Sequence, residues 1–386
     1  MRNGLFLILA ITLLAASCHF FDDGQPIEGF VTLKPGHFCQ LGAIAINGDT
    51  VFVAGSYLAD DDPNSEIKAV HSYLTAIKAN GEVIWELNPN KPDYTRWIKV
   101  AIDHKGNIFV IGNTNSPLNK LVASLVNLNS STGKVNERIW VEDSLPHQMA
   151  DVWITSLGQV AFLRTKELKG SGMPCINKQL ELFDGITIPH RDFCVNGSIS
   201  CAKFVNDTLY FSAWGRPGTT DYLYFINNKD SLKQLDNLEA LNGSMVNDIA
   251  SPYHNTFLLA TTGKNGQGPC MYQLGDNDSI IKNICLNYWP MHGSTHIEMI
   301  GDCKLLAFNA TDSTNGNAVH LVVINSTNEI AYEETIASNV PFNLSDVAVS
   351  QSKIYLAGTL ETDEKGSEMA IKIISLPPNT LCNLKN

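Results

Sequence analysis

Five ionisable residues stand at one place in a repeated pattern, near the start of an alternating apolar segment of the kind that forms a β-strand. They are Lys99, Asp151, Asp248, His296 and Asp346, and two further copies carry Ala43 and Ser200 there. Around a common axis, one cation, three acids and a histidine would surround one opening and could bind a polar ligand or a cation. Alternatively, the aspartates accept nearby backbone N–H groups in their own turns, and Lys99 only balances neighbouring acids.

Tryptophans add a second set of candidate ligand-binding residues. Trp97, Trp214 and Trp289 lie in or beside predicted loops, where they would widen the same surface and could stack on a sugar. Trp85 and Trp140 recur at equivalent positions late in their repeats, so we expect them to pack between repeats instead.

The elements that must position these residues are seven repeated β-hairpins. The clearest covers residues 99–114, where an alternating strand, a turn at Gly106-Asn107 and an apolar strand follow one another. The second strands of the seven copies begin at Val51, Ile108, Val160, Leu209, Phe257, Leu305 and Ile354, which lie about 50 residues apart. A second hairpin follows each copy, as at Asn80-Gly81, so each unit contains four antiparallel strands.

The seventh unit ends one strand early. Its third strand is predicted at Ala370–Leu376, and Pro377-Pro378 ends the pattern. A strand at residues 29–34 could complete this unit and cover an edge that would otherwise be exposed. The sequence therefore predicts an all-β fold, a seven-bladed β-propeller with four-stranded antiparallel blades, closed by an N-terminal strand and occupying residues 28–386 as one domain.

The repeat resembles the bacterial β-propeller repeat (SBBP-type) family. The resemblance rests on Val100-Ala101-Ile102-Asp103, Gly106-Asn107-Ile108-Phe109-Val110 and Gly112-Asn113-Thr114, and next on residues 348–359. It implies architecture and little about function, since that family has no single activity.

Residues 1–18 are predicted to be a lipoprotein signal peptide. Arg2 precedes an apolar run that ends in Leu14-Ala15-Ala16-Ser17-Cys18, which resembles a bacterial lipobox with Cys18 as the lipidated residue. An ordinary secretion signal is the alternative. Residues 19–27 would be a tether, whose Phe20-Phe21-Asp22-Asp23 resembles the export signals of surface lipoproteins in the Bacteroidetes group, or is only a solvated acidic segment. We expect attachment to the outer membrane by a lipid anchor, with surface exposure left open.

An oxidising compartment would allow disulfides among the other cysteines. The hairpin pattern predicts Cys175–Cys194 and Cys270–Cys285, because the start of one strand faces the end of the next. Cys39, Cys201, Cys303 and Cys382 stay unassigned.

Several functional classes lack support. The net charge of −12 disfavours a nucleic-acid partner. His292 and His296 are spaced like metal ligands, but Pro290 and Gly293 predict a loop, so no metal site is assigned. No nucleophile motif, catalytic residue or cofactor site is identified. We therefore expect a non-enzymatic binding or scaffolding protein with a glycan or protein ligand; the alternative is an enzyme acting on a polysaccharide or another envelope polymer through carboxylates on the channel face.

Overall fold

The computed structural model describes the chain in separate ranges. These are residues 29–59, 69–87, 95–115, 121–141, 147–154, 158, 160–167, 175–183, 193–196, 198–205, 208–214, 222–226, 232–234, 245–253, 256–262, 268–275, 280–312, 316–350, 353–362, 366–377 and 382. The predicted signal peptide, Cys18 and the tether lie outside them. Within these ranges, no helix is long and apolar enough to cross a membrane.

The described residues form seven four-stranded antiparallel sheets, which we number along the chain by their first strands. Sheet 1 contains β2 (His37–Asn47), β3 (Thr50–Ala59), β4 (Ala69–Lys78) and β5 (Val83–Leu87). Sheet 2 contains β6 (Thr95–Ile102), β7 (Asn107–Asn115), β8 (Leu121–Asn129) and β9 (Val135–Val141). Sheet 3 contains β10 (His147–Ile154), β11 (Val160–Glu167), β12 (Cys175–Phe183) and β13 (Phe193–Asn196).

The remaining sheets follow the same order. Sheet 4 contains β14 (Ser198–Val205), β15 (Thr208–Trp214), β16 (Tyr222–Ile226) and β17 (Leu232–Gln234), and sheet 5 contains β18 (Met245–Tyr253), β19 (Thr256–Thr262), β20 (Cys270–Leu274) and β21 (Ile280–Cys285). Sheet 6 contains β22 (Trp289–Ile300), β23 (Cys303–Asp312), β24 (Gly316–Ile324) and β25 (Ile330–Ile336). Sheet 7 contains β26 (Phe342–Ser350), β27 (Lys353–Thr362), β28 (Gly366–Ser375) and the N-terminal β1 (Phe30–Leu33).

The hairpin between β6 and β7 shows how local sequence produces one repeat. Asp103 accepts the backbone N–H groups of Lys105 and Asn107 through its Oδ1 atom, at 2.9 and 2.7 Å. Gly106 has a φ of +78°, a conformation that glycine adopts without steric cost. The turn therefore brings Ile102 opposite Ile108 and sets the register of both strands.

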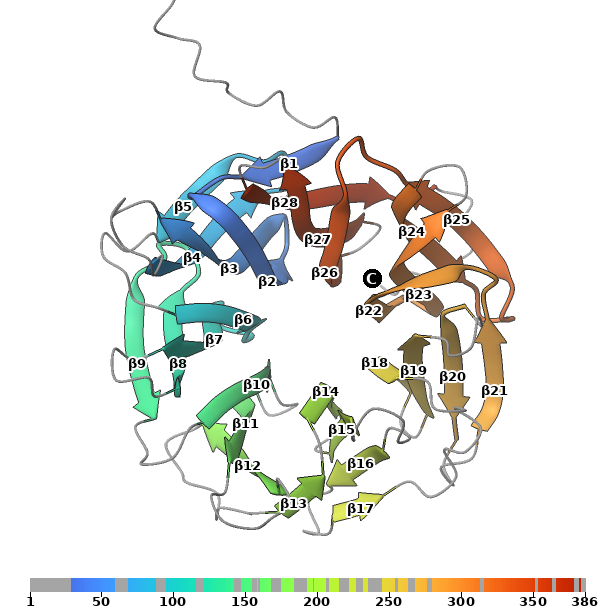
Figure 1. Cartoon of the computed structure of the whole chain (residues 1–386), viewed down its shortest axis with the longest axis horizontal. Helices are drawn as coiled ribbons and strands as arrows, with labels where there is room; N and C mark the ends of the chain where they lie inside the picture. The colour runs from blue at the N-terminus through green and yellow to red at the C-terminus, as the bar shows by residue number, and fades with distance from the viewer. Residues whose placement is uncertain are drawn as a thin grey trace, which may run out of the picture.

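The sheets are arranged around a common centre, with each first strand innermost (Figure 1). The apolar core lies in the seams between neighbouring sheets. Val51 and Val53 of β3, for example, belong to one buried cluster with Tyr355 and Ile371 of sheet 7. Trp85 on β5 packs as expected between repeats, because its Nε1–H donates to the carbonyl oxygen of Ser130 at 2.7 Å.

The N-terminal strand lies beside the last strand of the chain. β1 pairs antiparallel with β28, with Phe30 opposite Lys372 and Leu33 opposite Met369. The Phe30 ring also meets the Phe342 ring of β26 edge-on, with centroids 5.0 Å apart. The two ends of the described chain therefore share one sheet and one core.

Two disulfides are formed among the described cysteines. Cys270 and Cys285 are directly opposite in register and bonded, as the hairpin pattern predicted. Cys303 and Cys382, which the sequence left unassigned, form the other bond across 79 residues. In sheet 3, Cys175 faces Asn196 rather than Cys194 in the backbone register, and their side chains lie outside the described part of the chain.

The segment around His292 differs from the sequence prediction. Pro290 and Gly293 indicated a loop, but β22 runs from Trp289 to Ile300. The register with β23 is irregular between Pro290 and Thr295. A first strand pairs on one side only, so such an irregularity accommodates proline without breaking the sheet.

Candidate functional site

Most of the first strands contain a β-bulge at the same place, and the bulge changes the direction of the side chain that follows it. Six of them show a register shift immediately before the same position, which holds Ala43, Lys99, Asp151, Cys201, Asp248 and Asp346. His296 occupies this position in β22, as it stands at the same distance from its hairpin. Ser200, which the repeat alignment placed here, is the extra residue of its bulge. Bulges increase the local twist and turn side chains toward a site.

A second layer of charged residues stands two residues further along the same strands. Successive residues of a strand point to opposite faces, so residues two apart share a face. This layer holds Lys203 and Glu298, while the corresponding positions on β2, β6, β18 and β26 hold alanine. Sequence reasoning missed both residues, although the two-residue period starting from Cys201 and His296 would have found them. We call Lys99, Asp151, Lys203, Asp248, His296, Glu298 and Asp346 the central cluster.

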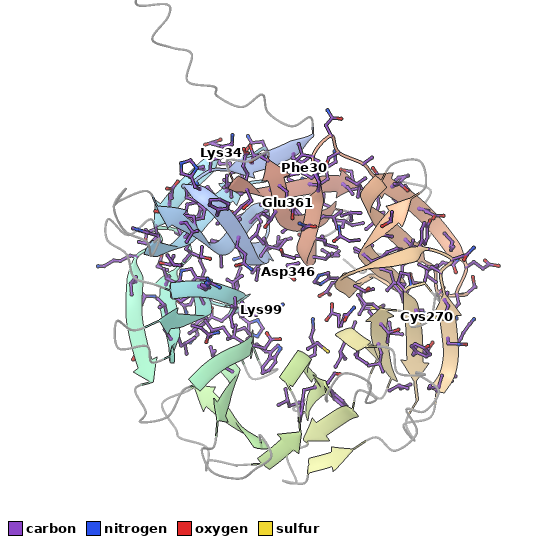
Figure 2. The ribbon with its side chains drawn as sticks, in the orientation of Figure 1. Phe30, Lys34, Lys99, Cys270, Asp346 and Glu361 are labelled. Carbon is purple, nitrogen blue, oxygen red and sulfur yellow. A yellow bond between two sulfur atoms is a disulfide. The ribbon has the colours of Figure 1, made fainter. Side chains whose placement is uncertain are left out.

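Two ion pairs of the central cluster join sheets that are not neighbours. Lys99 Nζ of sheet 2 lies 3.9 Å from Asp346 Oδ1 of sheet 7, and sheet 1 lies between these two sheets. Lys203 Nζ of sheet 4 lies 3.3 Å from Glu298 Oε1 of sheet 6, and sheet 5 lies between them. These side chains therefore reach into the centre, and Figure 2 shows Lys99 and Asp346 facing the space that the first strands surround.

The aspartates also bond to backbone amides. Asp346 Oδ2 accepts the N–H of Ile44 in sheet 1 at 2.9 Å, and Asp248 Oδ2 accepts the N–H of Ile297 in sheet 6 at 3.0 Å. Ile44 and Ile297 hold equivalent positions, so the same tie joins two pairs of neighbouring sheets. Asp248 Oδ1 also accepts the N–H of Ile249, and Asp151 Oδ1 accepts that of Val152, both at 2.8 Å. The sequence analysis gave backbone bonding by the aspartates as the alternative to ligand binding, and the structure shows such bonds because the inner-strand amides need acceptors.

Burial and neighbouring charges oppose each other in the central cluster. Burial raises the pKa of Asp151 to about 6, although Lys99 and Lys203 act in the opposite direction. Burial also raises the pKa of Glu298. The Asp346 carboxylate raises the pKa of Lys99, and Glu298 raises that of Lys203, so both lysines stay charged. Near neutral pH, four carboxyl groups face two ammonium groups.

His296 is the neutral member of the central cluster. Its Nδ1 atom lies 3.8 Å from Asp248 Oδ2, and its side chain is 11% exposed. Burial lowers the pKa of the imidazole, an effect that outweighs the opposing influence of Asp248 and Asp346. Among the described residues, its Nε2 atom is buried without a hydrogen-bond partner.

The predicted tryptophans fall in different places. Trp97 is not in or beside a loop: it is the third residue of β6, is 8% exposed and belongs to the core between sheets 1 and 2. Trp214 ends β15 and Trp289 begins β22, and the side chains of both lie outside the described residues. Trp97 is buried because the bulge at Ile98 turns it toward the seam and Lys99 toward the centre.

The central cluster offers charge and hydrogen bonding. Among the residues that the structure describes, no three His, Cys, Asp or Glu side chains are grouped to hold a metal ion. Side chains from sheets far apart in sequence meet at one centre, and each carboxylate with a described partner bonds a lysine or a backbone amide. Such an arrangement is suited to holding a polar group.

Comparisons with known proteins agree with the repeat architecture. The family described as "Beta-propeller repeat" (SBBP) matches residues 95–119. No curated protein sequence matches the chain significantly. Among solved structures, the polysaccharide lyase Uly1 is similar with a TM-score of 0.57 and 10% identity, over 91% of this chain and 100% of the lyase.

Two further solved structures share the fold. An acylaminoacyl peptidase from Pyrococcus horikoshii has a TM-score of 0.56 and 11% identity, over 89% of this chain and 52% of the peptidase. The Dos1 propeller has a TM-score of 0.51 and 9% identity, over 91% of this chain and 97% of that chain. At such identities the likeness concerns the fold alone. The chain is thus an all-β protein of four-stranded antiparallel sheets with a propeller repeat.

Proposed function

We propose that this protein is a seven-bladed propeller, closed by β1, that binds a polar ligand at the central cluster without chemical turnover. The observation that carries the proposal is the pair of salt bridges that reach across the centre between sheets that are not neighbours. A chain needs no such charges to pack its sheets, because the seams are already apolar. Clusters of charged groups with shifted pKa values are often found at functional sites.

The balance of charge indicates the ligand class. The four carboxyl groups outnumber the two lysines, and His296 is neutral, so the central cluster favours a ligand that carries a positive charge or many hydroxyl groups. A glycan or a protein segment with a basic side chain would meet this requirement. The ammonium groups of Lys99 and Lys203 would then contact acceptor oxygens of the same ligand.

An enzyme acting on a polysaccharide is the second candidate, and Asp151 is the observation that favours it. A carboxyl group with a pKa of about 6 can donate a proton near neutral pH, as a general acid must. In this case Asp151→Asn would abolish release of polymer fragments while binding persisted.

Array binding tests the binding proposal. The protein lacking residues 1–18 is screened on glycan and peptide arrays, and hits are titrated calorimetrically against wild type, Lys99→Met and Glu298→Gln. We expect at least tenfold weaker binding in both variants. Lys353→Met is the matched control, because Lys353 pairs with the exposed Asp49 and not with the central cluster. No hit on either array, equal affinity in all variants, or cleavage of the bound polymer would contradict the proposal.

We also propose attachment to the outer membrane through a lipid on Cys18. The support is the resemblance of residues 14–18 to a lipobox. One cysteine that carries several acyl chains is sufficient for stable attachment. Cys18→Ser should therefore move the protein from the detergent phase to the aqueous phase in a partitioning experiment, and unchanged partitioning would contradict the anchor.

A further inference from the structure

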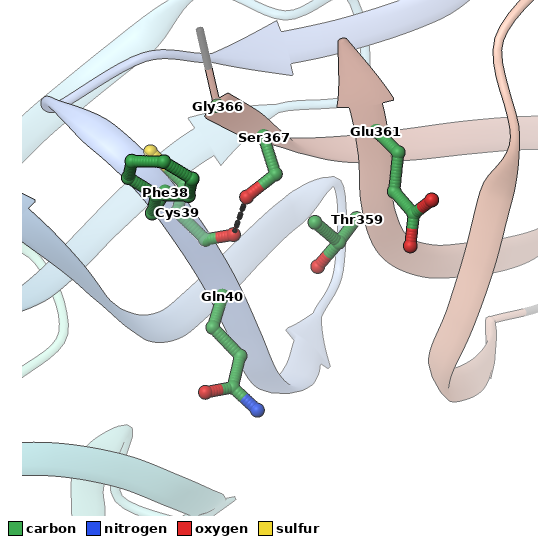
Figure 3. Close-up of a pocket in the computed structure, with 7 residues that line it drawn as sticks. All are labelled: Phe38, Cys39, Gln40, Thr359, Glu361, Gly366 and Ser367. Carbon is green, nitrogen blue, oxygen red and sulfur yellow. Dashed lines mark hydrogen bonds between the residues drawn. The ribbon is translucent and has the colours of Figure 1, made fainter. Parts of the chain in front are cut away.

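A cavity of about 460 Å³ opens in the seam between sheet 7 and sheet 1 (Figure 3). It is lined by Phe38, Cys39, Gln40, Thr359, Glu361, Gly366 and Ser367. These segments are the start of β2, the end of β27 and the start of β28, so they lie at the same end of their antiparallel strands. The volume falls within the range of small-molecule sites, about 300–1,000 Å³.

Phe38 is held at this cavity by an unusual backbone. Its φ is +48°, a strained backbone conformation for a residue other than glycine. The register of β2 and β3 shifts between His37 and Gln40, so a bulge contains Phe38 and directs its ring to the surface, where the residue is 46% exposed. Gly366 permits this arrangement, because a Cβ atom there would lie 3.0 Å from the Phe38 nitrogen.

The polar atoms around the ring both donate and accept hydrogen bonds. Thr359 Oγ1 accepts the N–H of Leu41 at 3.4 Å, which leaves its own hydroxyl hydrogen to donate. Ser367 Oγ donates to the carbonyl oxygen of Cys39 at 2.7 Å, which leaves its lone pairs to accept. Glu361 Oε1 is held by the Asn343 amide at 2.6 Å. Gln40 can both donate and accept through its amide.

Covalent chemistry is not what this cavity provides. Burial raises the pKa of Cys39 to about 11, so the residue stays a thiol at neutral pH. Its Sγ atom lies 3.2 Å from the carbonyl oxygen of Gly36. The thiol therefore forms part of the wall of the cavity.

We propose that this cavity, which we call the rim pocket, binds one pyranose unit of a neutral oligosaccharide. An aromatic face suits the apolar C–H face of a sugar ring, and mixed donors and acceptors suit its hydroxyl groups, each of which donates one bond and accepts others. A cationic ligand would need more than the single carboxylate of Glu361. The rim pocket is separate from the central cluster, and its occupancy does not depend on the function proposed there.

Titration with neutral tetrasaccharides built from glucose, mannose, galactose or N-acetylglucosamine tests this site. Phe38→Gly removes the ring and relaxes the backbone, so we expect binding to weaken at least tenfold while the melting temperature stays equal or rises. Phe38→Tyr keeps the aromatic face and should bind within threefold of wild type. Glu361→Gln keeps the bond to Asn343 and should weaken binding severalfold.

Two controls separate this site from others. Ile281→Ala removes an even more exposed apolar side chain from β21 and should bind like wild type. Glu298→Gln reports on the central cluster: sugar binding that weakens in Glu298→Gln but not in Phe38→Gly belongs to the central cluster and overturns the rim-pocket proposal, so failure of one site is distinguishable from failure of the other. The proposal is overturned if no tetrasaccharide binds at millimolar concentration, if Phe38→Gly binds as wild type, or if it lowers the melting temperature by several degrees. Preference for spermidine over every sugar would also overturn it.

Discussion

Asp248 and Asp151 stand at the same place in their sheets, yet their surroundings differ. Asp248 uses both oxygens as acceptors, one for its own neighbour Ile249 and one for Ile297 of the next sheet. Asp151 gives its Oδ1 to its own neighbour Val152, and burial raises its pKa to about 6. One residue type at one repeated position therefore serves two purposes: Asp248 and Asp346 tie sheets together, and Asp151 supplies a carboxyl group that protonates near neutral pH.

The difference teaches that position in a repeat does not determine a role. A tie between sheets requires both a carboxylate and an amide at the right height on the neighbouring strand, as Ile44 and Ile297 provide. Removal of a tie should cost stability, whereas removal of a buried charge should not. Four predictions sharpen this contrast, ordered by expected size.

The largest effect should come from the strand that joins the chain ends. Deletion of residues 1–34 removes Phe30 and Leu33, which are 9% and 6% exposed, and uncovers the edge of β28. Loss of two buried side chains and a strand should cost on the order of 5–10 kcal/mol, comparable to the stability of a whole domain. Thermal unfolding should show a collapse in melting temperature. Deletion of residues 1–28, which keeps β1, and deletion of residues 383–386 are the controls. If the protein without residues 1–34 melts at the same temperature as these controls, a closing role for β1 is excluded.

Removal of the disulfides should cause the next largest losses in the free energy of unfolding. Replacement of Cys303 and Cys382 by serine releases a loop of 79 residues, which corresponds to about 4.5 kcal/mol in the chain-entropy estimate. The same change at Cys270 and Cys285 releases 15 residues and about 3 kcal/mol. Denaturant unfolding of the two double variants should therefore rank them in this order. A reversed order would indicate that local strain or residual structure outweighs loop length.

Asp248→Asn tests the tie between sheets 5 and 6. Both carboxylate oxygens accept N–H groups, so an amide places an NH₂ donor against one of them and loses that bond. We expect a loss of about 1–3 kcal/mol in the free energy of unfolding. Asp151→Asn is the matched control, because Asn can keep the single bond that Asp151 accepts from Val152. Asp248→Glu is not used as a control because the longer side chain shifts the oxygens. Equal losses in the two variants would contradict the contrast.

Asp151→Asn should also change the pH dependence of stability. The carboxyl group has a pKa of about 6 in the folded protein, above the ordinary aspartate value of 3.8, so the folded state retains a proton that the unfolded state releases. Its contribution to stability therefore falls as pH rises from about 4 to about 6 and stays constant above. The variant should lack this fall and gain on the order of 1–2 kcal/mol at pH 7. Denaturant curves at pH 4 and pH 7 measure the difference, and identical slopes with pH would contradict it.

The sequence by itself determined the repeat and its strands. Alternating apolar residues, turn residues such as Gly106-Asn107 and a spacing of about 50 residues are local features, so they predicted the hairpins and the Cys270–Cys285 pair. The hairpins and the disulfide are confirmed because neighbours in the chain decide strand pairing within a hairpin. The sequence also placed Asp151, His296 and their counterparts near the starts of the first strands, but the structure places them further along, as with Asp151 in β10 (His147–Ile154) and His296 in β22 (Trp289–Ile300).

Only the tertiary structure decided which side chains meet. Lys99 meets Asp346 although nearly 250 residues separate them, and Lys203 meets Glu298 across a sheet that lies between them. The Cys303–Cys382 bond, the burial of Trp97 and the exposure of Phe38 each depend on a bulge or a chain end whose partner lies elsewhere in the chain. The physical reason is that charge, burial and hydrogen bonding depend on distance in space, and only folding brings separate repeats within that distance.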